Sequence, residues 1–278
     1  MTAVVLFLLF AVLCGVWAMT LNPYRGVVDV PVSTMDLDEV LTKKQAAKDI
    51  ALVHRLLKTR HPAWLIDKEV AEQVENALEE TKRDLPETIT VLQLWQRLGR
   101  VLHLLGDGHT RIWASPKYPQ YLSDMSLLRE YGPPVSIQGI TADQFVQSAL
   151  PLLSYEMETY AEHQLLNDYL QSAHWMRYLG VDTTDGITMT FDTEDGEQSV
   201  AFDYVLLNLV KGMEEKPWIH YEIDREHDLG VFTLSACIVN DEYIQTLDAF
   251  FQEVFEKDIS RIAVDLRANG GGNSYVAN

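Results

Sequence analysis

The chain has 278 residues, enough for one large domain or two small ones, and its hydrophobic (47%) and charged (23%) fractions are those of an ordinary globular protein. This composition excludes a disordered chain and a membrane protein with several spans. The formal net charge of −19 argues against a nucleic-acid partner, because phosphate binding needs clustered Lys and Arg. The two cysteines, Cys14 and Cys237, offer no disulfide framework or cysteine zinc site. We expect no cofactor and no metal.

Residues 1–24 are predicted to be a signal peptide or a membrane anchor. Ala3 to Met19 is an uncharged apolar run, and the small residue Ala18 near its end suits a cleavage site. A buried N-terminal helix is the weaker interpretation, because the run is apolar on every side. We therefore expect an extracytoplasmic protein, secreted or anchored, whose contact with the membrane is confined to this segment.

Residues 42–115 are predicted to form an N-terminal helical domain. Two capping boxes, Thr42 to Gln45 and Thr90 to Gln93, each precede apolar residues at helical spacing. A further helix is expected from about Asp67 to Leu85, with Pro86 closing it. Three amphipathic helices with short connections predict a small bundle.

An Asp-Gly-His-Thr turn at 107–110 follows the third helix. The glycines of this stretch allow a sharp turn that presents His109 at the start of an extended segment. Taken alone, a histidine after a turn is more often a surface or capping residue than a catalyst, and His61 is expected to pack a helix end. The turn alone therefore does not indicate a catalytic histidine, and a second motif is needed for that interpretation.

Residues 130–215 are predicted to form an intermediate region. A strand entering a turn around residues 131–140 precedes a helix from Ala142, and helical spacing continues through 155–179. A hairpin is expected from Ile187–Phe191 and 199–202 around a turn at Glu194 to Gly196. His163 and His174 have no other metal-ligating residues near them in sequence, so we interpret both as surface or packing residues.

Residues 216–278 are predicted to form the start of an α/β unit. Strands at 218–223 and 229–234 precede a helix capped by Asn240 or Asp241, and a strand from Arg261 follows. The order strand, helix, strand predicts a crossover between parallel neighbours. The run at 262–266 has the apolar pattern of a strand buried on both faces. Three glycines, 270–272, come at its carboxyl end, where exposed N–H groups can hold an oxyanion or a phosphate.

The Asp-Leu-Arg-x-Asn-Gly-Gly-Gly string at 265–272, together with the Asp-Gly-His-Thr turn, resembles the tail-specific (C-terminal-processing) serine peptidases and the related tricorn-like proteases. The resemblance implies an α/β (α+β) protein with an N-terminal helical bundle, a degenerate PDZ-like segment and an incomplete ClpP/crotonase-like core with a mixed sheet and a crossover helix. It implies hydrolysis of a polypeptide substrate. It assigns His109 as the candidate base and Asp107 as its support. It also assigns Gly270 and Gly271 as oxyanion donors, and Asp265, Arg267 and Asn269 as structural support.

The nucleophile that this resemblance requires is not evident before Asn278. Ser274 lacks the glycine spacing of a nucleophile elbow, since Val276 stands where a glycine is expected, and Ser235 is better explained as a strand end. The sequence is therefore predicted to be the front part of such an enzyme, truncated or a fragment. Whether the mechanism is Ser-His or Ser-Lys stays open.

Two alternatives come from other classes. A nucleotide-binding protein would use the strand and glycines as a phosphate cradle, but Tyr275 occupies the last glycine position of the dinucleotide pattern and no Gly-Lys-Ser/Thr follows. An exported, non-catalytic peptide-binding or scaffold module on the peptidase fold is favoured by the missing nucleophile.

Overall fold

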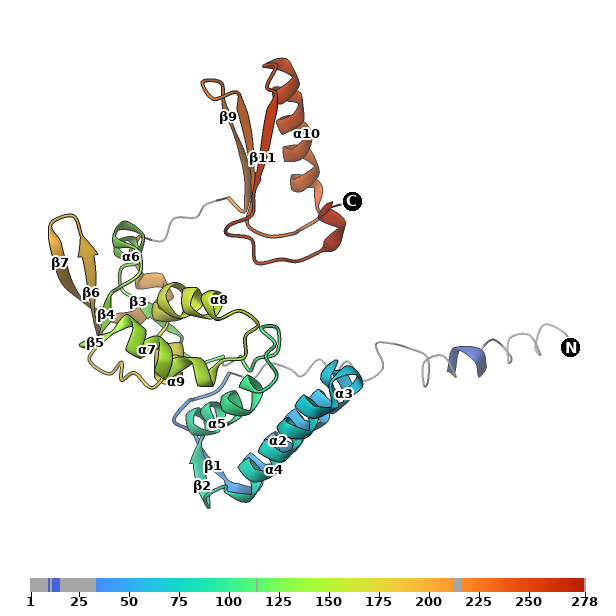
Figure 1. The fold of residues 1–278 in the computed structure, drawn as a ribbon, viewed down its shortest axis with the longest axis vertical. Coiled ribbons are helices and arrows are strands. Elements are labelled where there is room, and N and C mark those ends of the chain that lie inside the picture. The colour runs from blue at the N-terminus through green and yellow to red at the C-terminus, as the bar shows by residue number, and fades with distance from the viewer. Residues whose placement is uncertain (1–9, 11, 16–33, 114, 213–216, 278) are drawn as a thin grey trace, which may run out of the picture. The chain divides into compact units, whose positions relative to one another are not determined.

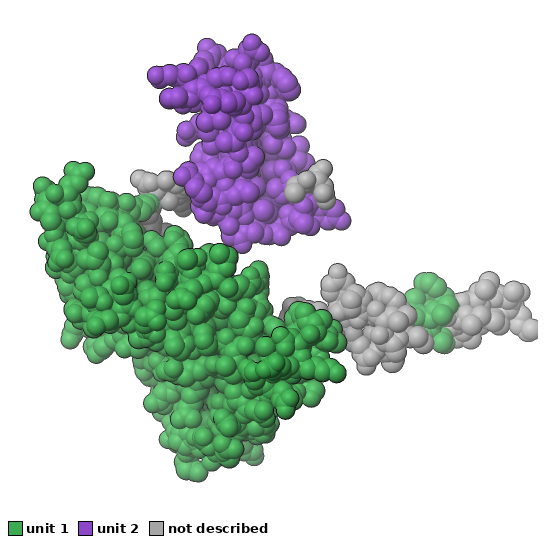
Figure 2. Space-filling model, in the orientation of Figure 1, with its two compact units in different colours: residues 1–212 green, residues 213–278 purple. Residues whose placement is uncertain are grey.

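The computed structural model describes residues 10, 12–15, 34–113, 115–212 and 217–277. The predicted signal peptide or anchor at 1–24 lies almost wholly outside these residues. Among the helices that are described, none combines the length and the apolar character needed to span a membrane. The chain divides into two compact units, Met1–Gly212 and Met213–Asn278, each coloured separately in Figure 2. The second unit begins close to the predicted boundary at 216.

The helical part of unit 1 contains the predicted helices, which Figure 1 draws in blue to green. Both predicted capping boxes are present, at Thr42 with Gln45 and at Thr90 with Gln93. A short antiparallel pair joins the starts of the helices that they cap. The elements are β1 (Val40–Thr42), α2 (Lys43–Arg60), α3 (Ala63–Ile66), α4 (Lys68–Arg83), β2 (Thr88–Thr90) and α5 (Val91–His103). Their apolar faces form one hydrophobic cluster, which includes fully buried Ala46 and Val74.

The remainder of unit 1 packs on a second and larger cluster of buried side chains. A four-stranded sheet has the order β5-β4-β6-β7, and β3 pairs with β8 in a two-stranded sheet. The predicted hairpin is present as β6 and β7, with Thr193 opposite Gly196. The elements are β3 (Gln120–Leu122), α6 (Ser126–Tyr131), β4 (Ser136–Ile137), β5 (Ile140–Thr141), α7 (Ala142–Ala149), β6 (Ile187–Thr193), β7 (Gly196–Phe202), β8 (Tyr204–Leu206) and the 3-10 turn η5 (Leu207–Leu209).

The stretch at 155–179, expected to be helical throughout, consists of short pieces. These are α8 (Glu158–His163), the π turn η3 (Gln164–Asp168), the 3-10 turn η4 (Tyr169–Gln171) and α9 (Ala173–Tyr178); a further 3-10 turn, η2 (Leu150–Leu152), follows α7. Ser172 interrupts the helical path because its backbone is extended, with φ −132° and ψ 124°. After the break, Tyr178 of α9 stacks on Trp95 of α5, and Trp175 of α9 stacks on Tyr169 of η4.

Unit 2 is a three-stranded sheet of order β11-β10-β9 with one helix, α10 (Asp241–Glu256), and a C-terminal 3-10 turn, η6 (Ser274–Ala277). The strands β9 (Ile219–Asp224) and β10 (Leu229–Leu234) are antiparallel, and β10 is parallel to β11 (Arg261–Asp265). Asn240 caps α10 through the N–H of Tyr243. The predicted crossover between parallel neighbours is therefore present.

The predicted burial of the last strand was wrong. Within unit 2, Ile262, Val264 and Leu266 are 46%, 58% and 52% exposed. The reason is topological: β11 is at an edge of the sheet, and the buried side chains of α10, Phe250 and Val254, pack with residues of β9 and β10. An apolar run of this kind specifies a strand, but the presence of a covering layer depends on the rest of the sheet.

Candidate functional site

Asp107 organises the turn that follows α5. Gly106 takes a left-handed φ of +58°, which stops the helix and starts the turn. The Asp107 carboxylate accepts hydrogen bonds from the Thr110 hydroxyl (2.5 Å), the His109 backbone N–H (2.8 Å) and His61 Nε2 (3.1 Å). Burial raises the pKa of Asp107, but the bonds from Thr110, His109 and His61 outweigh that effect and hold the pKa below its ordinary value. The side chain is thus a fixed anion at neutral pH.

His61 is fixed through both of its ring nitrogens. Its Nδ1 accepts the backbone N–H of Ala63 (3.1 Å), so in the neutral ring the proton is on Nε2, which donates to Asp107 (3.1 Å). The side chain is only 10% exposed. His61 packs the end of α2 and also orients Asp107. Because neither nitrogen is available, His61 cannot exchange a proton with a ligand in this arrangement.

His109 has the opposite character, with a side chain that is 90% exposed. Its Nδ1 lies 3.5 Å from Asp107 Oδ1 and 3.5 Å from Glu156 Oε1. Over the described ranges its Nε2 has no hydrogen-bond partner. An imidazole with Nδ1 turned toward a carboxylate and Nε2 open has the orientation required of a general base.

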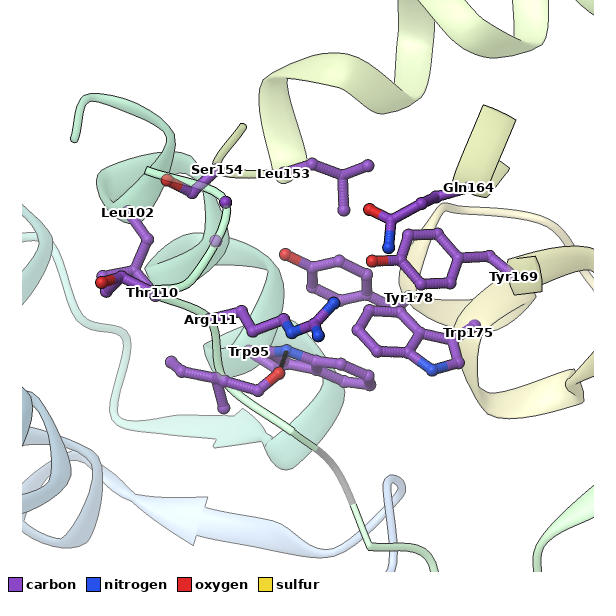
Figure 3. A pocket seen from close by; sticks show the side chains of 13 residues that line it. Trp95, Leu102, Thr110, Arg111, Leu153, Ser154, Gln164, Tyr169, Trp175 and Tyr178 are labelled. Atoms are coloured by element: carbon purple, nitrogen blue, oxygen red, sulfur yellow. Dashed lines mark hydrogen bonds between the residues drawn. The ribbon is translucent and has the colours of Figure 1, made fainter. Parts of the chain in front are cut away.

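Arg111 anchors the loop that carries His109. Figure 3 shows its side chain extending toward Tyr169 and Tyr178 in a small aromatic cavity of about 20 Å³, room for about one water molecule. Burial raises the pKa of Tyr169, while the guanidinium of Arg111 acts in the opposite direction. Trp95 Nε1 donates to the Ile112 carbonyl at 3.2 Å and ties the same loop to α5.

An open pocket of about 360 Å³ lies beside this loop. The end of α2 and the turn at 107–112 form its walls. Its lining is Val53, Leu56, Leu57, Arg60, His61, Pro62, Leu102, Asp107, His109, Thr110, Arg111 and Ile112. Six of these residues are apolar and six have polar side chains, and the volume is within the usual range of ligand sites.

The glycine turn of unit 2 is held by one side chain. Asn269 Nδ2 donates to the Leu234 carbonyl (2.8 Å), and its Oδ1 accepts the N–H of Gly271 (2.7 Å). The N–H of Gly270 donates to the Ser235 carbonyl at 3.2 Å. The two amides predicted as oxyanion donors are therefore engaged within the turn. Of the three glycine amides, the N–H of Gly272 has no partner among the described residues.

Asp265 and Arg267 form a bidentate ion pair, with Nε to Oδ1 at 2.9 Å and the terminal nitrogen to Oδ2 at 2.7 Å. The pair lowers the pKa of Asp265 to about 2, because Arg267 donates to the ionised carboxylate through its side chain and its backbone N–H. The Arg267 side chain is 91% exposed, and its hydrogen bonds to described residues all go to Asp265. The pair braces the strand end, whereas Asn269 holds the glycines.

The structure brings the predicted site residues together in two groups. Asp107 and His109 are adjacent in unit 1, and Asp265, Arg267, Asn269, Gly270 and Gly271 are adjacent in unit 2. Of the two serines weighed as nucleophiles, Ser274 is exposed at the start of η6, and the hydroxyl of Ser235 donates to the Trp218 carbonyl at 3.0 Å. That bond agrees with the interpretation of Ser235 as a strand end.

Sequence reasoning did not identify Glu156 as a neighbour of His109, nor His61 as a partner of Asp107. Glu156 lies in an irregular segment before α8, and no motif or spacing connects it with the Asp-Gly-His-Thr turn. The His61-Pro62 pair at the end of α2 was a visible signal, but it indicates a helix stop as readily as a contact.

No protein-family model matches the chain, and no curated protein matches it at a significant level. Within the described residues, the structure is a mixed helix and sheet protein of two units.

Proposed function

We propose that the chain is part of an exported or membrane-anchored serine peptidase of the tail-specific or tricorn-like type, which hydrolyses peptide bonds in a polypeptide substrate. The nucleophile is a serine outside this sequence. In this proposal the segment at 130–215 is a degenerate PDZ-like module, and unit 2 is the first part of a ClpP/crotonase-like core. The strand–turn–helix at β4, β5 and α7, with Gln138 at a left-handed φ of 49°, supports the first assignment.

The observation that carries the proposal is the orientation of His109. Asp107 is held in place by three donors, and His109 presents Nδ1 to it while Nε2 stays open. In the proposed reaction, Nε2 takes the proton of the serine hydroxyl as that oxygen attacks the scissile carbonyl. Asp107 then stabilises the imidazolium that forms, and the 3.5 Å separation shortens to a hydrogen bond as charge develops.

The glycine turn supplies the complementary part of the chemistry. The tetrahedral intermediate carries a negative oxygen that needs N–H donors, and loss of one such donor costs on the order of a hundredfold or more in rate. We propose that the free N–H of Gly272 is the first donor. Gly270 and Gly271 become donors only if their bonds to Ser235 and Asn269 open.

The experiment is labelling with a serine-directed fluorophosphonate. A longer chain that contains the downstream serine should be labelled, and the 278-residue chain should not. In the longer chain, His109→Ala should slow labelling on the order of 10²- to 10⁴-fold, the usual contribution of a general base. The matched control is His163→Ala, which removes another exposed histidine. Equal labelling rates for the two variants would contradict the role of His109, and labelling of the short chain at Ser274 would show that the nucleophile is within it.

A non-catalytic peptide-binding or scaffold module is the second candidate. The hydrogen bonds of the Gly270 and Gly271 amides favour this function, because amides bonded within the turn stabilise the turn and are not available to an oxyanion. A longer chain that binds peptides yet resists the fluorophosphonate would support this function over hydrolysis.

A further inference from the structure

We propose that Asp107, His109 and Glu156 bind a divalent transition-metal ion of the Zn²⁺ class, and that the bound ion blocks His109 as a base. The binding part stands on geometry alone, and the regulatory part rests on the proposed function. One oxygen of each carboxylate and one nitrogen of His109 lie within 4.8 Å of one another. The three side chains come from the turn after α5 and from the segment before α8.

The distances suit a shared ion better than direct hydrogen bonds. His109 Nδ1 lies 3.5 Å from Asp107 Oδ1 and 3.5 Å from Glu156 Oε1, which exceeds the usual 2.7–3.2 Å of an N–H···O bond. Two ligands that are each about 2.0–2.2 Å from a tetrahedral zinc ion are themselves about 3.3–3.6 Å apart. Both separations therefore match ligands around one central ion.

The donor set also selects the class of ion. One imidazole nitrogen with two carboxylate oxygens suits zinc and related transition metals, whereas Mg²⁺ and Ca²⁺ prefer oxygen alone. The two carboxylates balance the charge of a divalent ion. Three protein ligands leave a fourth position for water, as in open zinc sites.

The partners of Asp107 complete the arrangement. Thr110 and His61 both donate to Oδ2. Within the part of the chain that the structure describes, the oxygen that faces His109, Oδ1, accepts only the His109 backbone N–H. A carboxylate oxygen has a second lone pair, which is free for an ion. Outer hydrogen bonds of this kind orient metal ligands and strengthen binding. His61 and Thr110 thus orient the Asp107 carboxylate on one side of the site. Glu156, whose side chain is 60% exposed, supplies the ligand on the other side.

Occupancy has a direct chemical consequence. A metal ion on Nδ1 requires that nitrogen to be without a proton, so the neutral ring carries its proton on Nε2. Nε2 is the atom that must accept the proton of the nucleophile in the proposed reaction. The ion would thus hold His109 in the wrong tautomer and draw its ring toward Glu156, and release of the ion would restore the base.

The test is a calorimetric titration of the 278-residue chain with Zn²⁺, in a Cys14→Ser and Cys237→Ser background that removes both thiols. We expect one site. Glu156→Gln should weaken zinc binding at least about tenfold, because even outer-shell partners of a metal site are worth about 10- to 100-fold. The control is Glu158→Gln, which removes the same charge two residues away and should leave the affinity unchanged. His109→Gln should abolish the site, with the far-ultraviolet circular dichroism of each variant confirming the fold.

Equal zinc affinity for the parent and Glu156→Gln, or no binding by the parent, would overturn the site. These results need no peptidase activity, so they are independent of the proposed function. The regulatory part is tested in the longer chain, where Zn²⁺ should slow fluorophosphonate labelling of the parent and spare Glu156→Gln. If zinc binds through Glu156 and labelling is unaffected, the regulatory part is wrong. If the longer chain is never labelled, the proposed function fails while the metal site stands.

Discussion

The Asp107 turn and the glycine turn are organised by opposite means. In unit 1, the carboxylate of Asp107 accepts from the side chains of His61, at the end of α2, and of Thr110, and the Asp107 N–H donates to Ser154 in the segment before α8. In unit 2 the turn is held mainly by backbone: Gly272 pairs with Cys237, and the Asn269 side chain bonds to the Leu234 carbonyl and the Gly271 N–H. We therefore expect the Asp107 turn to be destabilised by loss of the carboxylate, and the glycine turn to be destabilised by an added side chain.

The largest effect is expected from Gly272→Ala. A Cβ at this position would lie 2.3 Å from the Cys237 carbonyl oxygen, and the φ of +137° is unfavourable for any side chain. We expect a loss of about 3 kcal/mol or more in the stability of unit 2, from strain and overlap with backbone. Gly270→Ala is the control, because its Cβ would meet nothing within 4 Å, and its cost should stay within about 0.5 kcal/mol. Urea denaturation of both variants measures the difference, and similar losses would contradict a sterically determined turn.

The next effect is expected from Asp107→Ala in unit 1. The change leaves the Thr110 hydroxyl, the His109 N–H and the largely buried His61 Nε2–H without their acceptor, which should cost about 2–3 kcal/mol. Asp185→Ala, at an exposed aspartate, is the matched control and should be nearly neutral. If the two changes cost the same in thermal unfolding, the carboxylate does not organise the turn.

The smallest effect is expected from His174→Gln, which should change how the stability of unit 1 depends on acid pH. Burial lowers the pKa of His174 to about 4, below the value near 6.5 of an exposed histidine. Between these values the unfolded chain binds the extra proton and the folded chain does not, so the stability of unit 1 falls as the pH drops from 6.5 toward 4. Partial exposure to solvent reduces the loss to about 1–2 kcal/mol. His174→Gln should flatten this part of the stability profile relative to the parent, and an unchanged slope would assign the sensitivity to other groups.

The sequence allowed prediction of what local chemistry determines. The capping boxes at Thr42 and Thr90, the cap at Asn240 and the hairpin that closes at Gly196 all formed, because each depends on a few neighbouring residues. Features that depend on contacts between distant parts of the chain could not be predicted from the sequence. The exposure of Val264 depends on which strand ends the sheet, and the proximity of Glu156 to His109 depends on the contact between the segment before α8 and the turn after α5.

The candidate site divides in the same way. The pairing of Asp107 with His109 and of Asp265 with Arg267 was predictable from residues two apart in the sequence. The engagement of the Gly270 and Gly271 amides was not, because it depends on the carbonyl of Ser235, which follows β10, and on the side-chain oxygen of Asn269. A run of glycines shows where backbone can approach a ligand, but not which of its N–H groups remain free.

His109 is proposed to act as a general base that Asp107 holds in place. Fluorophosphonate labelling of the longer chain with Asp107→Asn tests this directly, and Asp185→Asn is the matched control at an exposed aspartate. Asp107→Asn should slow labelling on the order of 10²- to 10⁴-fold, because an amide cannot stabilise the imidazolium, and the control should react at the parent rate. Equal labelling rates for the two variants would show that Asp107 does not support His109 as a base.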